Sequence, residues 1–274
     1  MPEDDHAPVV ERVLHAEIPG DGTMVMRVDV SVIIPVRDEA ENIQSLAGEL
    51  SEVMEGHPWS WECIWINDGS SDDTQSILED VARGDIRHRY IVFESNAGQS
   101  AAFWAGFKES RGAILATIDG DGQNDPRDIP RLVELIGSGQ VDMANGYRIR
   151  RKDSLTRKVS SWIANAFRNA VTGRTVRDVG CSTRAFKREC VECLPLFAGM
   201  HRFLPTLIGL QGYRLGEFPV NHRPRLRGKS KYNISNRLWV GLLDTLGVFW
   251  LRKRAFRFVV LRRSEEAPRV RESA

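Results

Sequence analysis

Two aspartates separated by one residue form a candidate metal site. Asp119 and Asp121 follow the apolar run 113–118 directly, and Gln123 comes two residues later. Carboxylates at this spacing can converge on one hard cation, and oxygen ligands suit Mg²⁺ or Mn²⁺, which commonly bridge substrate phosphates. Such a cation would offset the charge on a departing diphosphate. The pattern therefore predicts a divalent-metal site for a phosphate-containing substrate.

Two further acids, Glu39 and Asp68, come just beyond two other apolar runs. Their oxygens can accept hydrogen bonds from a ribose or a base N–H, although acids in such loops also cap helices. Neither G-x-G-x-x-G nor G-x-x-x-x-G-K-[ST] follows the first apolar run. Their absence argues against an NAD or FAD enzyme and against a P-loop NTPase.

The spacing of apolar residues predicts the elements that must position these acids. We expect strands over 28–36, 61–66, 89–93, 113–118 and 141–147. Helical spacing falls between them, over 42–54, from a cap at Ser71 or Asp72 to about 83, and over 100–110 and 128–136. Strand and helix therefore alternate with short links, which is typical of an open, mostly parallel, doubly wound α/β sheet. In such sheets ligands bind at the carboxyl ends of the strands, where the acids lie.

Positive charge is concentrated near the end of the chain. Residues 221–263 hold twelve Lys or Arg and one acid, Asp244, which gives a local charge of about +11. Such a block attracts nucleic acid, substrate phosphate or anionic lipid. The apolar stretch 238–251 is shorter than the ~20 residues needed to cross a bilayer, but it is long enough to lie in a membrane interface. A helix over 154–172 is expected to be amphipathic as well.

The start of the chain and its cysteines indicate the compartment. Residues 1–22 lack the apolar core of a signal peptide. Cys190 and Cys193 form one C-x-x-C with no second pair, which is weak support for zinc or redox chemistry. We therefore expect a cytosolic, reduced protein.

Several longer motifs resemble one enzyme family. The runs are IIPVRDEAENI, INDGSSDDT, NAGQSAAFWAG, TIDGDGQNDP, GYRIRRKD, RDVGCSTRAFKRE, GMHRFLP and RGKSKY. Together they resemble the family 2 glycosyltransferases of the GT-A fold, and among them the polyprenyl-phosphate sugar synthases, of which dolichyl-phosphate mannosyltransferase is the best-known member. The match extends from about Val30 to about Leu251.

The resemblance implies roles for the residues at matching positions. The nucleotide pocket would be formed by Pro35, Val36, Glu39, Asp68, Asp119 and Gly120. The metal would be held by Asp119, Asp121 and Gln123. The donor diphosphate and the acceptor phosphate would meet Arg148, Arg202, Ser230 and Lys231. The reaction would depend on Asp121 and on the three cationic residues Arg148, Arg202 and Lys231. The sugar pocket would be shaped by Asp178 and Gly180.

The sequence departs from the family pattern at two places. The usual Asp-Asp before Gly-Ser is Asn67-Asp68, and the usual D-x-G-C-G-F-R reads DVGCSTR from Asp178 to Arg184. These departures leave the sugar and the choice between UDP and GDP open.

The residues also favour a phosphate acceptor. An alcohol acceptor must lose a proton to a general base, and many family 2 enzymes resemble one another in a Glu-Asp pair with that role. The corresponding stretch 199–203 contains no acid, and His201 is the alternative base. A lipid phosphate is already anionic and needs cations instead, which Arg148, Arg202 and Lys231 can supply. One direct displacement would invert the anomeric carbon.

We therefore predict an inverting hexosyltransferase that uses a nucleotide-sugar donor, a polyprenyl-phosphate acceptor and Mg²⁺ or Mn²⁺. We expect loose tails over 1–27 and 264–274, a catalytic domain over 28–235 and a basic, amphipathic segment over 236–263. This segment would hold the enzyme peripherally on the anionic inner face of the cell membrane. A membrane-protein partner or a second copy of the chain is the alternative anchor, and no nucleic acid is expected.

Three other functions remain open from the sequence. A family 2 transferase acting on a hydroxyl of a glycolipid or polysaccharide would need a general base near the acceptor. A nucleotidyltransferase usually has a glycine-rich phosphate loop after the first strand, and PVRDEAEN is not one. A non-enzymatic module for anionic lipid or nucleic acid would explain the basic block but not the paired aspartates.

Overall fold

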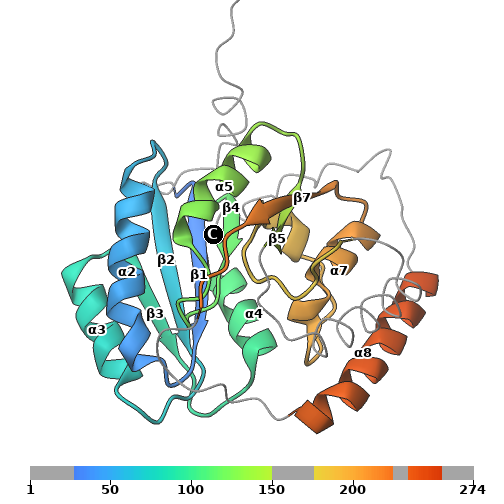
Figure 1. Cartoon of the computed structure of the whole chain (residues 1–274), viewed down its shortest axis with the longest axis horizontal. Coiled ribbons are helices and arrows are strands. Elements are labelled where there is room, and N and C mark those ends of the chain that lie inside the picture. The colour runs from blue at the N-terminus through green and yellow to red at the C-terminus, as the bar shows by residue number, and fades with distance from the viewer. Residues whose placement is uncertain (1–27, 150–175, 225–233, 255–274) are drawn as a thin grey trace, which may run out of the picture.

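A seven-stranded sheet runs through the molecule, in the order β3-β2-β1-β4-β6-β5-β7 (Figure 1). The computed structural model describes residues 28–149, 176–224 and 234–254. The strands are β1 (Val30–Val36), β2 (Trp61–Asn67), β3 (His88–Val92), β4 (Ile114–Thr117), β5 (Met143–Arg148), β6 (Arg184–Lys187) and β7 (Leu215–Val220). Neighbouring strands are parallel except at β6, which is antiparallel to both β4 and β5.

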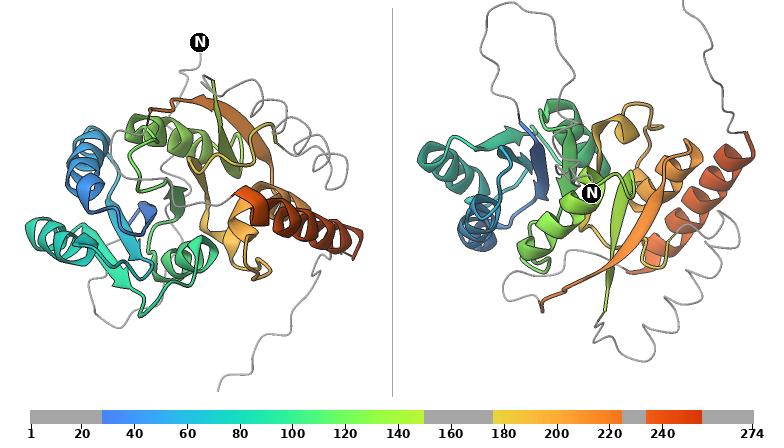
Figure 2. Two further views of the ribbon diagram at one scale, coloured as in Figure 1. Left: turned by 60° about the horizontal axis from the view of Figure 1, so that its bottom comes forward. Right: turned by 90° about the horizontal axis from the view of Figure 1, so that it is seen from above.

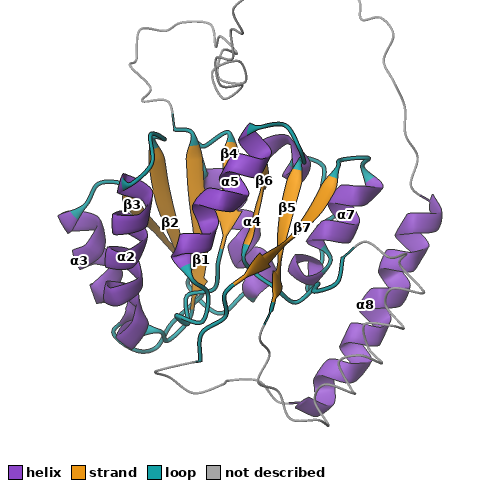
Figure 3. Ribbon diagram, turned by 45° about the horizontal axis from the view of Figure 1, so that its top comes forward, coloured by secondary structure: helices purple, strands orange, loops and turns teal. Residues whose placement is uncertain are grey.

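Helices cover both faces of this sheet (Figure 3). They are α2 (Ala40–Glu55), α3 (Thr74–Gly84), α4 (Gln99–Glu109), α5 (Ile129–Gly137), α7 (Leu204–Leu210) and α8 (Ile234–Arg254). Short 3₁₀ turns lie over Pro126–Asp128, Arg188–Val191 and Met200–Arg202. Two apolar clusters, one on each face, join the helices to the sheet: α2, α3 and α5 pack on one face, and α4, α7 and α8 on the other.

Strand β1 shows why the sequence has a continuous apolar run there. Val32 and Ile34 point to the cluster under α2 and α5, whereas Ile33 points to the cluster under α4. All three side chains are fully buried. A strand covered on both faces needs apolar residues at every position, so the run does not alternate with polar residues.

Helix α8 lies at the opposite side of the molecule from α3 (Figure 1). Figure 2 shows it (red) beside α7 (orange), and Val248 belongs to the same apolar cluster as Leu204 and Leu207. In the described part of the chain, no helix combines the length and apolar composition that crossing a bilayer requires.

The predicted α/β fold is confirmed, and each of the five predicted strands and four predicted helices has a counterpart close to its expected bounds. Strands β6 and β7 were not predicted. The tails 1–27 and 264–274, the helix expected over 154–172 and the end of segment 236–263 beyond Arg254 lie outside the described residues.

Candidate active site

A cleft of about 700 Å³ opens at the carboxyl ends of β1, β2 and β4. Its wall contains nine of the residues that the sequence assigned to the site: Pro35, Val36, Glu39, Asp68, Asp119, Gly120, Asp121, Gly180 and Arg202. They come from five segments that are far apart in the sequence: the ends of β1, β2 and β4, the segment before β6 and the loop before α7. The parallel pairing of β1 with β2 and β4 brings the first three of these segments to one edge of the sheet, as expected for a doubly wound fold.

Asp119 follows β4 and faces the cleft with both carboxylate oxygens hydrogen-bonded. Gln99 Nε2 donates to Oδ1 at 2.9 Å, and the Ser182 hydroxyl donates to Oδ2 at 2.6 Å. Burial and the nearby charge of Asp121 raise the pKa of Asp119, whereas the Ser182 hydrogen bond acts in the opposite direction. A bound cation would offset the effect of the Asp121 charge on Asp119, so the two carboxylates are a suitable pair of ligands.

The residues present fit a hard divalent cation. Asp119 and Asp121 offer oxygen ligands on one wall of the cleft. Within residues 28–149, 176–224 and 234–254, no group of three or more His, Cys, Asp or Glu side chains is placed to hold a metal. A cation here would therefore take its remaining ligands from substrate phosphate and water, which is the usual habit of Mg²⁺.

Gln123, the third predicted ligand, does not line the cleft. Its backbone N–H donates to Asp121 Oδ1 at 3.1 Å, and its side-chain amide donates to the carbonyl of Arg223 at 3.4 Å. Arg223 N–H donates back to the carbonyl of Gln123 at 2.8 Å. The structure thus brings Gln123 to the segment that follows β7, and its role as a ligand stays a prediction.

Gly120 lies between the two aspartates, where no side chain fits. A Cβ at this position would lie 2.4 Å from Val36 Cγ1 and 3.1 Å from the carbonyl oxygen of Pro35. The end of β4 can therefore approach the end of β1 closely because residue 120 is glycine.

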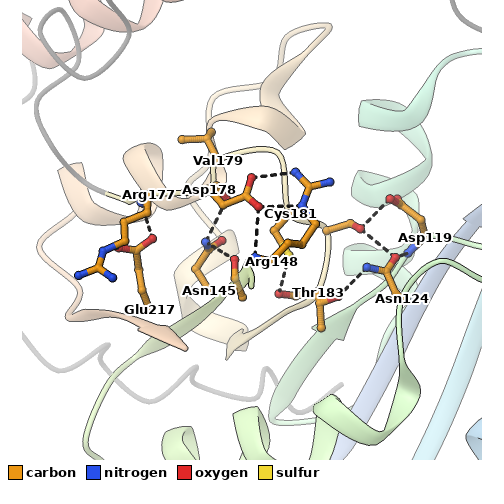
Figure 4. Close-up of polar contacts among 12 residues, drawn as sticks. Asp119, Asn124, Asn145, Arg148, Arg177, Asp178, Val179, Cys181, Thr183 and Glu217 are labelled. Atoms are coloured by element: carbon orange, nitrogen blue, oxygen red, sulfur yellow. Dashed lines mark hydrogen bonds and ion pairs between the residues drawn. The ribbon is translucent and has the colours of Figure 1, made fainter. Parts of the chain in front are cut away.

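Hydrogen bonds join the aspartate loop to the start of β6 (Figure 4). Asn124 Oδ1 accepts from the backbone N–H of Asp119 at 2.9 Å, and Asn124 Nδ2 donates to Thr183 Oγ1 at 2.7 Å. The Thr117 hydroxyl donates to the carbonyl of Ser182 at 2.6 Å. The position of Asp119 thus depends on residues more than sixty positions later in the chain.

Asp68 shapes the cleft through the loop before α4. Its carboxylate accepts from Asn96 Nδ2 at 2.6 Å, from Ala97 N at 2.7 Å and from Gly98 N at 3.0 Å. The side chain therefore fixes the backbone that leads to Gln99. The predicted contact of Asp68 with the nucleotide stays a prediction.

Arg148 and Asp178 form an ion pair next to the cleft (Figure 4). Arg148 Nε donates to Asp178 Oδ2 at 2.7 Å, and Nη2 donates to Oδ1 at 2.8 Å. Burial disfavours the charged guanidinium, but the hydrogen bonds and charge of Asp178 outweigh this effect and raise the pKa of Arg148. Neither residue lines the cleft, whereas Gly180 does, and a Cβ on Gly180 would lie 3.3 Å from Arg148 Nη2. The pair therefore lies behind that part of the wall.

Arg184 lines the cleft, although no role was predicted for it. It is 3% exposed, and its three nitrogens donate to Asn145 Oδ1, the His201 carbonyl and the Val179 carbonyl at 2.9, 2.8 and 2.7 Å. All three acceptors are neutral. The cleft therefore has a buried positive charge that is satisfied by hydrogen bonds.

The loop before α7 contributes Gly199, His201 and Arg202 to the lining of the cleft. Ser100 Oγ accepts from the backbone N–H of Gly199 at 2.9 Å and lies 2.7 Å from His201 Nδ1. These contacts tie the loop to the first turn of α4. Ser230 and Lys231, which the sequence assigned to the phosphates, lie outside the described residues.

Sequence reasoning missed Gln99, Ser182 and Arg184, all of which line the cleft. Each belongs to a motif that carried the family resemblance, NAGQSAAFWAG or RDVGCSTRAFKRE. The departure at Ser182 was the one visible signal, because a hydroxyl stands where the family usually has glycine.

The chain matches the family model described as glycosyl transferase family 2 over residues 31–194. It belongs to glycosyl transferase family 2. This confirms the family that the motifs predicted and makes the chain a glycosyltransferase enzyme.

Similar curated proteins include two transferases that act on lipid phosphates by name. This glycosyltransferase is 36% identical over 243 residues to the dodecaprenyl-phosphate galacturonate synthase of Rhizobium johnstonii, a match that covers 87% of the chain and 72% of the relative. It is 36% identical over 205 residues to the undecaprenyl-phosphate 4-deoxy-4-formamido-L-arabinose transferase of Salmonella choleraesuis, covering 74% of the chain. The chain spans 62% of the length of that second relative.

Solved structures share the fold of this glycosyltransferase. Glucosyl-3-phosphoglycerate synthase from Mycobacterium tuberculosis, in complex with Mn²⁺, UDP-glucose and phosphoglyceric acid, superimposes with a TM-score of 0.62 at 17% identity, covering 84% of this chain and 81% of that one. The same enzyme with Mg²⁺ and UDP gives a TM-score of 0.60 at 18% identity, covering 80% of each chain. At these identities the likeness establishes the GT-A fold alone.

Proposed function

We propose that this glycosyltransferase moves one hexosyl group from a nucleoside diphosphate sugar to a polyprenyl phosphate. One observation carries the proposal: the aspartate pair and Arg202 share one cleft, and the wall formed by 198–202 contains no acid. The aspartate pair could hold a metal beside the donor diphosphate, and Arg202 could bind the acceptor phosphate. This arrangement suits a reaction in which the sugar passes from one phosphate group to the other. The names of the two curated relatives support the same acceptor class.

We propose Asp119 and Asp121 as the protein ligands of Mg²⁺ or Mn²⁺. When bound, the cation would supply positive charge for the leaving diphosphate. The Mn²⁺ and Mg²⁺ complexes of glucosyl-3-phosphoglycerate synthase, which has the same fold, are in keeping with this choice of metals. Gln99 and Ser182 would keep the Asp119 carboxylate oriented while the donor enters.

The reaction we propose is one displacement with inversion. A phosphate oxygen of the acceptor forms a bond to the anomeric carbon as the bond from that carbon to the diphosphate oxygen breaks. No proton has to move, because the acceptor phosphate is already ionised at neutral pH. Arg202 would receive that phosphate with its guanidinium, which can bind two phosphate oxygens at once.

A hydroxyl acceptor is the second candidate, and one contact favours it. His201 lines the cleft, and its Nδ1 lies 2.7 Å from Ser100 Oγ, which orients the ring. A histidine held in this way is a suitable general base. Replacing His201 by Gln would abolish transfer to a hydroxyl but preserve transfer to a phosphate.

We also propose that α8 lies on the anionic inner face of the membrane. Leu243, Leu246 and Trp250 are 66%, 47% and 59% exposed, and the last turn of the helix carries the exposed Arg252, Lys253 and Arg254. Apolar side chains can enter the interface while the basic ones contact lipid phosphates.

A donor panel tests the proposed function. The purified chain would be incubated with Mn²⁺, undecaprenyl phosphate and each of several UDP- and GDP-sugars, and the lipid product identified by its mass. We expect one hexosyl group on the lipid phosphate. Transfer to glycolipid hydroxyls with no phosphate-linked product would contradict the proposal.

A further inference from the structure

The one acidic side chain described on α8 is half-buried, and one of its two carboxylate oxygens is fully buried. Asp244 Oδ2 is buried and accepts no hydrogen bond from any residue within the described ranges. Burial raises the pKa of this carboxyl, and the charge of Arg202 lowers it. A buried carboxylate oxygen without a donor costs free energy, so this residue destabilises the site that it occupies.

The buried oxygen points at the wall of the cleft. A Cβ on Gly199 would lie 2.6 Å from Asp244 Oδ2 and 3.4 Å from its Cγ. Gly199 has a φ of +95°, which favours glycine, and it lines the cleft together with Arg202. The carboxylate is therefore directly behind the loop that carries Arg202.

Asp244 also lies on a helix with two different faces. Thr245 and Val248 are buried against the domain, whereas Leu243, Leu246 and Trp250 are exposed. A helix that needed only to pack could have an apolar or amide side chain at position 244. Asp244 instead places a carboxylate, whose burial costs free energy, against the Gly199 loop of the cleft.

We propose that Asp244 is a positioning residue whose charge keeps Arg202 and the Gly199 loop arranged for the acceptor phosphate. It thereby links the helix with the exposed apolar face to the cleft. The inference rests on the proposed function in one respect, namely that the acceptor group is a phosphate. The inference extends that site beyond the residues that would contact substrate, because Asp244 acts through Arg202.

The substitution Asp244→Asn tests this inference, because it keeps the shape of the side chain and removes its charge. We expect the melting temperature to stay constant or rise, since a carboxylate oxygen that is buried without a donor is replaced by part of a neutral amide. We expect the KM for a short, water-soluble prenyl phosphate to rise about tenfold, with the KM for the donor unchanged. The matched control is Asp80→Asn on α3, which removes one charge from a side chain that is 66% exposed.

Hydrogen exchange provides a readout that does not require activity. The backbone N–H groups of Gly199, Arg202 and Phe203 donate within the loop or to Ser100, so they report its order. We expect faster exchange at these amides in Asp244→Asn and in Gly199→Ala, but not in Asp80→Asn. If wild-type protein transfers no sugar to prenyl phosphate, the proposed function fails, and exchange still decides the role of Asp244. Unchanged exchange, or a lowered melting temperature with unchanged acceptor KM, would overturn the inference.

Discussion

The hydroxyl of Ser182 lies 2.6 Å from Asp119 Oδ2 and 3.1 Å from Asn124 Oδ1. A hydroxyl has one proton, and the closer, charged carboxylate is the stronger acceptor. Ser182 therefore orients the first aspartate of the pair from the segment that leads into β6. Glycine, the usual residue of the family at this position, has no side chain to do so.

Replacing Ser182 by Ala should weaken metal binding. We expect a loss of about 1 kcal/mol, the net contribution of a typical hydrogen bond, which is roughly a fivefold higher dissociation constant for Mn²⁺. Titration of Mn²⁺ by electron paramagnetic resonance, with UDP present, measures this directly. Ser76→Ala, which removes an exposed hydroxyl on α3, is the control. Equal Mn²⁺ affinity in both variants and wild type would show that Ser182 does not support the ligand.

Removing the metal should abolish transfer. Asp121→Asn keeps the size of the side chain and its acceptor for the Gln123 N–H, but it lowers the charge available to a cation. We expect at least a hundredfold lower kcat with an unchanged melting temperature in metal-free buffer, on the order of 3 kcal/mol in the barrier. Full activity of wild-type enzyme in excess chelator would contradict the metal proposal.

Arg202→Ala should cost far more activity than Arg202→Lys. Truncation leaves the acceptor phosphate without its cation, and the expected loss is about 2–5 kcal/mol in the barrier, as in breaking a buried charge pair. Lysine restores the charge but not the two-point grip. Steady-state kinetics with a soluble prenyl phosphate distinguish the variants. Arg202 does not contact the phosphate if both behave as wild type.

His88 should make the fold less stable in mild acid. Trp65 Nε1 is a donor only, and it donates to His88 Nδ1 at 3.1 Å, so the ring is neutral and its Nε2 proton points to Ser51 Oγ at 2.9 Å. Burial lowers the pKa of His88 below its ordinary value of 6.5. The unfolded chain thus binds the proton more readily, and the stabilisation present above pH 6.5 is lost as the pH falls through the folded-state value.

Urea unfolding between pH 7.5 and 5 measures this effect, with the range set by the ordinary pKa of histidine. His88→Gln should flatten the decline in the free energy of unfolding and lower stability at neutral pH by about 1–3 kcal/mol, because the Trp65 N–H loses its acceptor. The control is His57→Gln, a half-buried histidine outside this network. An identical pH slope in wild type and His88→Gln would rule out His88 as the titrating group.

Vesicle binding should depend on the basic end of α8. Attraction to anionic lipid should fall as the Debye length shrinks from ~10 Å at 0.1 M salt to ~3 Å at 1 M. Changing Arg252, Lys253 and Arg254 to Gln should lower vesicle flotation and activity on long-chain lipid together, while sparing activity on a short prenyl phosphate. The charge-matched control changes the exposed Arg83, Lys108 and Arg127 to Gln. Equal flotation of both triple variants would show that α8 is not the contact.

The sequence predicted the part of the fold in which strands and helices alternate along the chain. Strands β1 to β5 are signalled by apolar runs, and the metal pair Asp119 and Asp121 follows one of them directly. Strand β6 is four residues long and begins and ends with basic residues, so no local pattern marks it. The family resemblance predicted Arg148 at the phosphates. No local pattern could reveal that Arg148 forms an ion pair with Asp178, thirty residues later.

The position of β6 has a consequence for how the molecule assembles. Strands β1 to β4 pair through short crossovers within residues 30–117, whereas β6 must enter between β4 and a strand that precedes it in the chain. Local pairings form sooner than distant ones, because less chain has to be ordered to close them. The first four strands can therefore assemble while synthesis continues, and Asp119 gains its Ser182 partner only when the second half closes onto them. A released fragment that ends at residue 140 should accordingly have the early strands but not the ordered aspartate pair.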